Sequence, residues 1–158
     1  MAELLWGNVY YADTYCGILR EETGNRYTFQ YDRTYTGPPI AHLIPVRTDA
    51  YSTEYGLHPF FDNLLAEGWL ASAQSRLLGK REARPVELLL AFGHDCAGAV
   101  SVIDPSPRPL SNTLLDPTDA KSVAAYRSRA SLSGIQPKLS LKAMDNSGRP
   151  RVARSAHT

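Results

Sequence analysis

The chain has 158 residues, of which 43% are hydrophobic and 21% are charged, a composition typical of soluble globular proteins and not of disordered chains or coiled coils. This length accommodates one compact domain, or a small domain with an appendage, and excludes a complete enzyme of the larger two-lobed kinds. The longest apolar run, residues 88–92, is far shorter than the ~20 residues needed to cross a membrane. No basic segment followed by an apolar stretch opens the chain, so we expect a cytoplasmic protein.

The net charge of +1 conceals an uneven distribution of charged side chains. Residues 1–103 contain 8 Lys and Arg against 12 Asp and Glu, a balance of −4, whereas residues 104–158 contain 9 against 4, a balance of +5. An acidic front and a basic tail suggest two parts with different roles, although a short segment reaches such a charge readily by chance. The two cysteines, Cys16 and Cys96, match no zinc-ligand spacing, and we expect both to be buried and reduced.

The first third of the chain predicts strands. Residues 4–10 and 15–19 are separated by a turn-compatible break, and residues 26–31 alternate polar and aromatic side chains with the period of two of a half-buried strand. The sequence Glu-Thr-Gly-Asn at residues 22–25 is typical of a hairpin turn. Residues 41–46, which follow a Gly-Pro-Pro break, are a further short strand candidate. These segments predict a small antiparallel sheet or partial barrel.

The middle of the chain predicts helices. Apolar residues in 59–78 recur at the spacing of one helix face, with Gly68 as a weak point. Residues 85–92 predict a second helix, because a proline near the first turn and a glycine just past the end are typical boundaries. Residues 98–103 then return to strand. We therefore expect residues 1–103 to form a complete α+β unit whose strands come mostly first.

The remainder of the chain predicts a different organisation. The proline-rich residues 104–118 are expected to form an extended linker. Within residues 119–158 we expect a helix to about residue 127, then a loop containing serine and glycine, and then an incomplete β-hairpin. The predicted fold class is therefore α+β: a small antiparallel sheet or partial barrel with two or three helices, followed by a glycine-rich-loop β-hairpin.

The loop at residues 131–138 has the sequence most suggestive of chemistry. A glycine flanked by small hydroxyl residues lets backbone N–H groups converge on an anion. Lys138 would add a positive charge to such a binding site. A single glycine matches neither a Walker A loop nor a dinucleotide fingerprint, and an ordinary polar turn is the competing interpretation. The candidate residues of this phosphate-binding loop are Ser131, Leu132, Ser133, Gly134, Ile135, Gln136 and Lys138.

The histidines are weak candidates for catalysis. His58 and His94 are general bases in principle, and His94 is followed directly by Asp95 and Cys96. Adjacent residues on a helix or strand face different ways, which is poor geometry for a catalytic pair. We therefore expect a polar helix end with His94 near the negative end of the helix dipole. We assign no catalytic and no metal-ligating residue.

An apolar strip around residues 60–69 has two interpretations. Most of it is expected to be core, and the alternative is that part of it forms a partner-binding face. The candidate interface residues are Phe60, Phe61, Asn63, Leu64 and Trp69.

Four segments in order resemble one protein family. They are residues 27–32 (Tyr-Thr-Phe-Gln-Tyr-Asp), 59–68 (beginning Pro-Phe-Phe-Asp-Asn-Leu-Leu), 93–100 (Gly-His-Asp-Cys-Ala-Gly-Ala-Val) and 131–139 (Ser-Leu-Ser-Gly-Ile-Gln-Pro-Lys-Leu). Together they resemble the N-terminal part of the HipA family of serine/threonine kinases, the toxins of bacterial toxin–antitoxin systems. The resemblance covers about residues 9–142, and the four motifs in register are more specific than any one alone.

The resemblance implies a role for each part. Residues 1–103 resemble the small N-terminal subdomain that packs against the kinase. In three-component HipBST systems a similar domain is a separate antitoxin, HipS, which binds the kinase HipT. Residues 129–142 resemble the glycine-rich loop over the ATP phosphates, so ATP and Mg²⁺ are implied for the full-length kinase family and no cofactor for this chain alone. Ser131 matches the autophosphorylated serine of HipA, and Ser133 completes a Ser-x-Ser pattern similar to that of HipT. A phosphate on this loop would repel the nucleotide phosphates.

The sequence departs from the family where catalysis would begin. A kinase of this kind needs a lysine on the following strand, a catalytic aspartate with a metal-binding asparagine, and a second metal-binding aspartate, whereas the sequence given stops at Thr158. We therefore expect this chain alone to be catalytically inert. One hypothesis is a non-catalytic module that binds a HipA- or HipT-like kinase in an antitoxin-like role, and the alternative is an N-terminal fragment of a full HipA-like kinase.

DNA binding is a weaker hypothesis. The tail contains Arg149, Arg151 and Arg154, but it predicts no recognition helix, so direct nucleic-acid binding by this chain is not expected. In complexes of this type the DNA reader is usually a separate partner, HipB. The expected partners are therefore a HipA- or HipT-like kinase and a HipB-like antitoxin.

Overall fold

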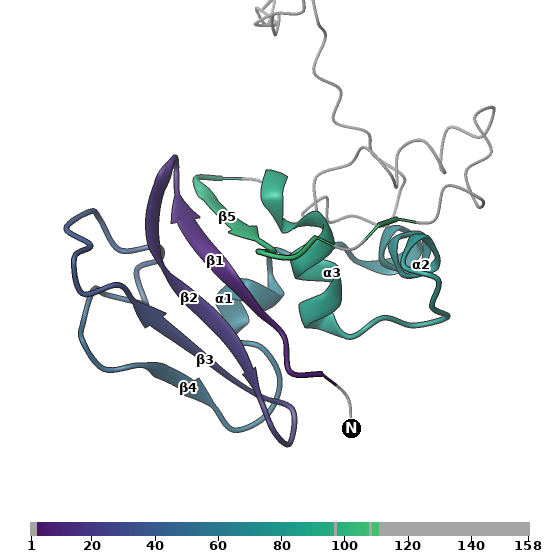
Figure 1. Ribbon diagram of the computed structural model, residues 1–158, viewed down its shortest axis with the longest axis horizontal. Helices are drawn as coiled ribbons and strands as arrows, with labels where there is room; N and C mark the ends of the chain where they lie inside the picture. Colours follow the sequence, from purple (N-terminus) through teal and green to yellow (C-terminus); the bar gives the residue numbers. More distant parts are fainter. Residues whose placement is uncertain (1–2, 97, 108, 111–158) are drawn as a thin grey trace, which may run out of the picture.

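The computed structural model describes residues 3–96, 98–107 and 109–110, and these residues form an antiparallel sheet with helices on one face (Figure 1). The elements in chain order are β1 (Trp6–Tyr11), β2 (Thr14–Glu22), β3 (Arg26–Tyr31), β4 (Tyr51–Thr53), α1 (Pro59–Asp62), α2 (Gly68–Leu77), α3 (Pro85–Phe92), the short 3₁₀ helix η1 (Gly93–Asp95) and β5 (Val100–Ile103). The predicted α+β class is confirmed, and the sheet is open. The glycine-rich-loop hairpin predicted to follow lies outside the described residues.

The strands form one five-stranded sheet in the order β4-β3-β2-β1-β5. The first and last strands are therefore neighbours, as the purple and green arrows of Figure 1 show, and Asn8 of β1 is opposite Ile103 of β5. Two tight hairpins build the centre. The turn between β2 and β3 contains Gly24 and Asn25, with φ of 78° and 58°, conformations that suit the turn of an antiparallel pair. The strand predicted at residues 26–31 coincides with β3.

A β-bulge decides which side chains of β2 point inward. Val9 is opposite Gly17 and Tyr10 is opposite Tyr15, so Cys16 is the extra residue. Cys16 is fully buried, and its Sγ lies 3.2 Å from the Val9 carbonyl oxygen. The rings of Tyr10 and Tyr15 meet edge to face, with centroids 5.7 Å apart. The bulge thus places a thiol in the core and an aromatic pair outside it.

The fourth strand was predicted at residues 41–46, and this prediction was wrong. Those residues contain one isolated bridge, between Ala41 and Ile44, and β4 follows at residues 51–53. The Tyr31 hydroxyl holds the loop instead: it donates to the Ile44 carbonyl oxygen at 2.6 Å and accepts the Ile40 N–H at 2.9 Å. Because these backbone groups bond to a side chain, they do not need a strand partner.

One helix was predicted over residues 59–78, and the structure has two, α1 and α2. Glu67 is extended, with φ −118° and ψ 161°, and Gly68 has φ +59°, a left-handed conformation that a glycine adopts at little cost. The segment that joins the two helices contains Leu64 and Ala66, and both side chains are buried. The helix predicted at residues 85–92 is confirmed as α3.

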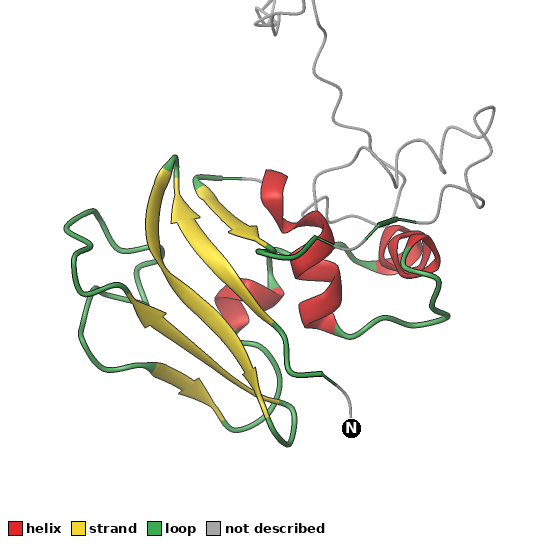
Figure 2. Ribbon diagram, viewed as in Figure 1, coloured by secondary structure: helices red, strands yellow, loops and turns green. Residues whose placement is uncertain are grey.

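The core lies between the sheet and the helices. Alternate residues of β3, Tyr27, Phe29 and Tyr31, are buried, and Phe61 of α1 packs on Phe29 with ring centroids 5.4 Å apart. Figure 2 shows the red helices on one side of the yellow sheet, and no helix of the described residues lies on the other side. Large, fully buried side chains include Val9, Leu19, Tyr27, Phe29, Ile44, Phe61, Val86, Leu89 and Phe92.

Candidate partner-binding surface

The predicted interface strip is divided between core and surface. Phe61 is 0% exposed and Leu64 is 7% exposed, so both side chains belong to the core. Phe60 and Trp69 are half-buried and pack against the core, and Asn63 is exposed. The candidate interface at this place is therefore reduced to Phe60, Asn63 and Trp69. The spacing of apolar residues along a helix does not separate the buried from the exposed members of this strip, because α1 is a single turn.

Within the described residues, the histidine candidates for catalysis lie apart from each other in role: one caps a helix and the other is at the surface. His58 caps α1, where its Nδ1 accepts the Phe60 N–H at 3.2 Å, and burial lowers its pKa. His94 is exposed, whereas Cys96 is buried with its Sγ 3.3 Å from the Gly93 carbonyl oxygen. Burial raises the pKa of Cys16 to about 12, so this thiol is a poor nucleophile at neutral pH.

The phosphate-binding loop predicted from sequence lies outside the described residues. This applies to Ser131, Leu132, Ser133, Gly134, Ile135, Gln136 and Lys138, and therefore also to both autophosphorylation candidates. Within the ranges that the structure describes, no group of three or more His, Cys, Asp or Glu side chains is placed to hold a metal ion. Among the same residues, no helix is long and apolar enough to span a membrane.

Exposed apolar side chains mark surfaces that the sequence analysis did not single out. Among the described residues, the large ones are Leu4 (48% exposed), Trp6 (44%), Leu43 (78%), Val46 (42%) and Tyr55 (82%). Leu4 and Trp6 flank the buried Leu5, so side chains alternate between surface and core at the start of β1. This alternation is visible in the sequence, but a strand pattern alone does not indicate which of its two faces is exposed.

Leu4 and Trp6 line one end of a groove that runs along α3, which we call the α3 groove. It consists of two adjoining cavities that share Leu5, Leu90 and Asp104. The cavity at the N-terminal segment, the acidic half, has a volume of about 240 Å³ and is lined by Glu3, Leu4, Leu5, Trp6, Leu90, Asp104, Pro105 and Ser106. The other, the apolar half, has a volume of about 310 Å³ and is lined by Leu5, Leu78, Lys80, Glu87, Leu90, Ala91, Asp104 and Pro109.

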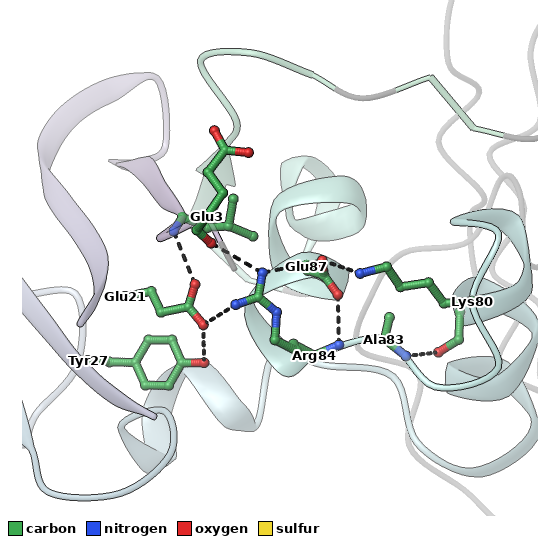
Figure 3. A network of polar contacts seen from close by, with 9 residues as sticks. Glu3, Glu21, Tyr27, Lys80, Ala83, Arg84 and Glu87 are labelled. Carbon is green, nitrogen blue, oxygen red and sulfur yellow. Dashed lines mark hydrogen bonds and ion pairs between the residues drawn. The ribbon is translucent and has the colours of Figure 1, made fainter. Parts of the chain in front are cut away.

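An ion-pair network fixes the walls of the α3 groove (Figure 3). Arg84, the residue before α3, donates from Nη1 to Glu21 Oε1 at 2.6 Å, and its Nη2 lies 3.4 Å from Glu87 Oε1. Lys80 Nζ also donates to Glu87 Oε1, at 2.6 Å. The two glutamates are buried, with side chains 6% and 4% exposed, while Arg84 and Lys80 reach the surface. Each buried carboxylate is thus paired, as burial of charge requires.

The same network holds the segment that enters β1. Glu21 Oε2 accepts the Leu5 N–H at 3.1 Å, and Arg84 Nη2 donates to the Glu3 carbonyl oxygen at 3.4 Å. The Tyr27 hydroxyl lies 3.5 Å from Glu21 Oε1. In Figure 3 the Glu3 side chain points away from these contacts. Residues 3–5 are therefore fixed through their backbone, and Glu3 and Leu4 are among the residues that line the acidic half of the groove.

Ionisation states follow from this arrangement. Burial works to raise the pKa of Glu87, but the hydrogen bonds from Lys80 and the Arg84 N–H, together with the charges of both residues, outweigh it, so the pKa is lowered. Burial, and then the nearby Glu21 carboxylate, raise the pKa of Tyr27 to about 12. Glu87 is therefore charged and Tyr27 is neutral at physiological pH.

The described residues form a small α+β domain, and comparison with known proteins gives its family. The structure resembles a solved structure titled N-terminal domain of HipA toxin, with a TM-score of 0.50 and 22% identity over 68% of this chain and 100% of that one. The family model for the HipA N-terminal domain matches residues 7–103. The chain therefore belongs to the HipA N-terminal domain family. A Haemophilus influenzae protein described as uncharacterized is 28% identical over 96 residues, which cover 61% of this chain and 89% of that protein.

Proposed function

We propose that this chain is a non-catalytic HipA N-terminal module of a bacterial type II toxin–antitoxin system, and that it binds and modulates a HipA- or HipT-like kinase. The family match supports the connection to HipA toxins. The groove beside α3 and the exposed Leu4 and Trp6 support a role in binding, because apolar side chains gathered at a groove are typical of interaction surfaces.

One observation carries the proposal most directly. The family match ends at residue 103, which is also the last residue of β5. Because β5 pairs with β1, the matched segment completes the five-stranded sheet and contains most of the core residues. A unit that folds around its own core can act on a partner without being covalently attached to it.

The test is co-purification of the full chain with a HipA- or HipT-like kinase from the same genome. We expect a complex that survives size-exclusion chromatography at micromolar concentrations, and we expect the chain to change the rate of kinase autophosphorylation. A serine/threonine kinase of another family, mixed at the same concentrations, is the control. Absence of a complex with the HipA-like kinase would contradict the proposal.

The sequence motif at residues 131–138 favours a second candidate. In this alternative the chain is the N-terminal fragment of a full HipA-like serine/threonine kinase toxin, whose ATP loop is regulated by autophosphorylation at Ser131. Coding sequence downstream of Thr158 that contains the missing lysine and aspartates would select this alternative. For the chain alone we expect no ATP binding tighter than millimolar in the presence of Mg²⁺, measured by isothermal titration calorimetry.

A further inference from the structure

We propose that the apolar half of the α3 groove is occupied by the continuation of this same chain, with Leu114 and Leu115 packed against α3. The occupant is residues 111–118, which follow directly on Leu110, the last residue that the structure describes. This inference goes beyond the proposed function, because it concerns contacts within the chain and applies to both candidate functions.

The chain runs along the groove after it leaves the sheet. Asp104, the residue after β5, lines both halves, and Pro105 and Ser106 line the acidic half. Pro109 then lines the apolar half, and Leu110 packs against the core. The described part of the chain therefore ends at the wall of the apolar half.

The apolar half suits leucine side chains. It has a volume of about 310 Å³, and most of the residues that line it are apolar: Leu5, Leu78, Leu90, Ala91 and Pro109. Lys80, on its wall, donates to the buried Glu87 carboxylate at 2.6 Å. Because the charge of Lys80 is compensated within the wall, the cavity favours an apolar side chain over a charged one.

The sequence places two leucines within reach of this cavity. Three polar residues, 111–113, separate Leu110 from Leu114 and Leu115, and four residues of extended chain span at most about 14 Å. A loop this short costs little entropy to close, whereas a separate molecule loses translational and rotational freedom when it binds. The continuation of the chain is therefore favoured over a second copy or another protein as the occupant.

This contact extends the domain beyond the family match, which ends at residue 103. Residues 104–118, expected from the sequence to form an extended linker, become part of the folded unit. A partner then meets the acidic half, where Leu4 and Trp6 are exposed. To reach the apolar half, the partner must first displace residues 111–118.

The experiment is methyl NMR of the full chain with labelled leucine and alanine methyl groups. We expect nuclear Overhauser effects that join the methyl groups of Leu114 or Leu115 to those of the cavity wall, at Leu78, Leu90 or Ala91. The test variant is Leu114→Ser/Leu115→Ser. It should lose these contacts and shift the methyl resonances of the cavity wall.

The matched control is Leu139→Ser/Leu141→Ser, which removes two leucines from a later part of the same chain. In this control we expect the resonances of the cavity wall to stay where they are in the wild type. The methyl resonances of Leu43 should not move in either variant, because this side chain is 78% exposed and lines neither half of the groove.

Absence of these Overhauser effects in the wild-type chain would overturn the proposal. A control variant that shifts the cavity wall as strongly as the test variant would assign the cavity to a later segment, and would also overturn it. The same holds for contacts that appear only between differently labelled chains in a mixed sample, which would assign the cavity to a second copy. None of these outcomes involves a kinase, so failure of this proposal is distinct from failure of the proposed function.

Discussion

Arg84 Nη1 lies 2.6 Å from Glu21 Oε1, and this ion pair joins the start of α3 to a strand 63 residues earlier in the chain. The Glu21 side chain is 6% exposed and the Arg84 side chain is 35% exposed. The carboxylate is therefore desolvated, while its partner still reaches water. Removal of the arginine leaves a buried charge without its main compensation.

We expect Arg84→Met to lower the free energy of unfolding by about 3 kcal/mol, near the lower end of the cost of breaking a buried ion pair, because Arg84 is partly exposed. Urea denaturation measures the change. The control is Arg76→Met, at an exposed arginine of α2, for which we expect a change within about 0.5 kcal/mol. Adding Glu21→Gln should restore part of the loss, and strict additivity of the two substitutions would contradict the coupling.

The lowered pKa of Glu87 predicts a pH dependence of stability. A carboxyl group whose pKa is lower in the folded than in the unfolded state stabilises the fold above its unfolded pKa, and this contribution is lost as the pH falls through the folded pKa. The unfolded value is about 4.3. Urea denaturation at neutral pH and at several acidic pH values should show that Glu87→Gln is destabilised at neutral pH and that its difference from the wild type shrinks as the pH falls. A difference that does not change with pH would contradict the assignment.

The buried amide of Gln74 in α2 is expected to lower the stability of the fold, and an apolar side chain at this position should raise it. Its side chain is 1% exposed, and no described residue forms a hydrogen bond with its amide nitrogen or oxygen. An unsatisfied buried amide costs about 1–3 kcal/mol, so we expect Gln74→Met to raise the free energy of unfolding by about 1 kcal/mol. Thermal unfolding tests this. The matched control is Gln30→Met, where Nε2 donates to the Thr48 carbonyl oxygen at 3.2 Å, and we expect no gain there. A destabilised Gln74→Met would show that the amide has a polar partner.

Tyr31 predicts how the loop between β3 and β4 is held. Its buried hydroxyl bonds to Ile44 and Ile40, and burial raises its pKa to about 12, so it remains a donor at neutral pH. We expect Tyr31→Phe to cost about 1–3 kcal/mol, because both backbone groups lose a buried partner, and to speed hydrogen exchange of the Ile40 amide. Tyr55→Phe, at a side chain 82% exposed, is the control. Unchanged exchange at Ile40 in Tyr31→Phe would show that another contact holds the loop.

Local patterns accounted for much of the fold and for little of the candidate site. The alternation at residues 26–31 and the proline and glycine around residues 85–92 are local signals, and both elements are present as predicted. The break at Gly68 was noted only as a weak point, because the same apolar spacing fits one long helix or two short ones. The α3 groove could not be found in this way. It depends on the pairing of Glu21 with Arg84, which no periodicity in the sequence indicates.

The pairing of β5 with β1 has a consequence for how such domains are joined to other proteins. Ile103 is opposite Asn8, so the polypeptide enters and leaves the sheet at the same corner, and residues from both connections, Leu4 and Pro105 among them, line one cavity. A polypeptide attached before β1 and one attached after β5 would therefore both start from this corner, so a short linker at either end would give its cargo a high effective concentration at the same cavity.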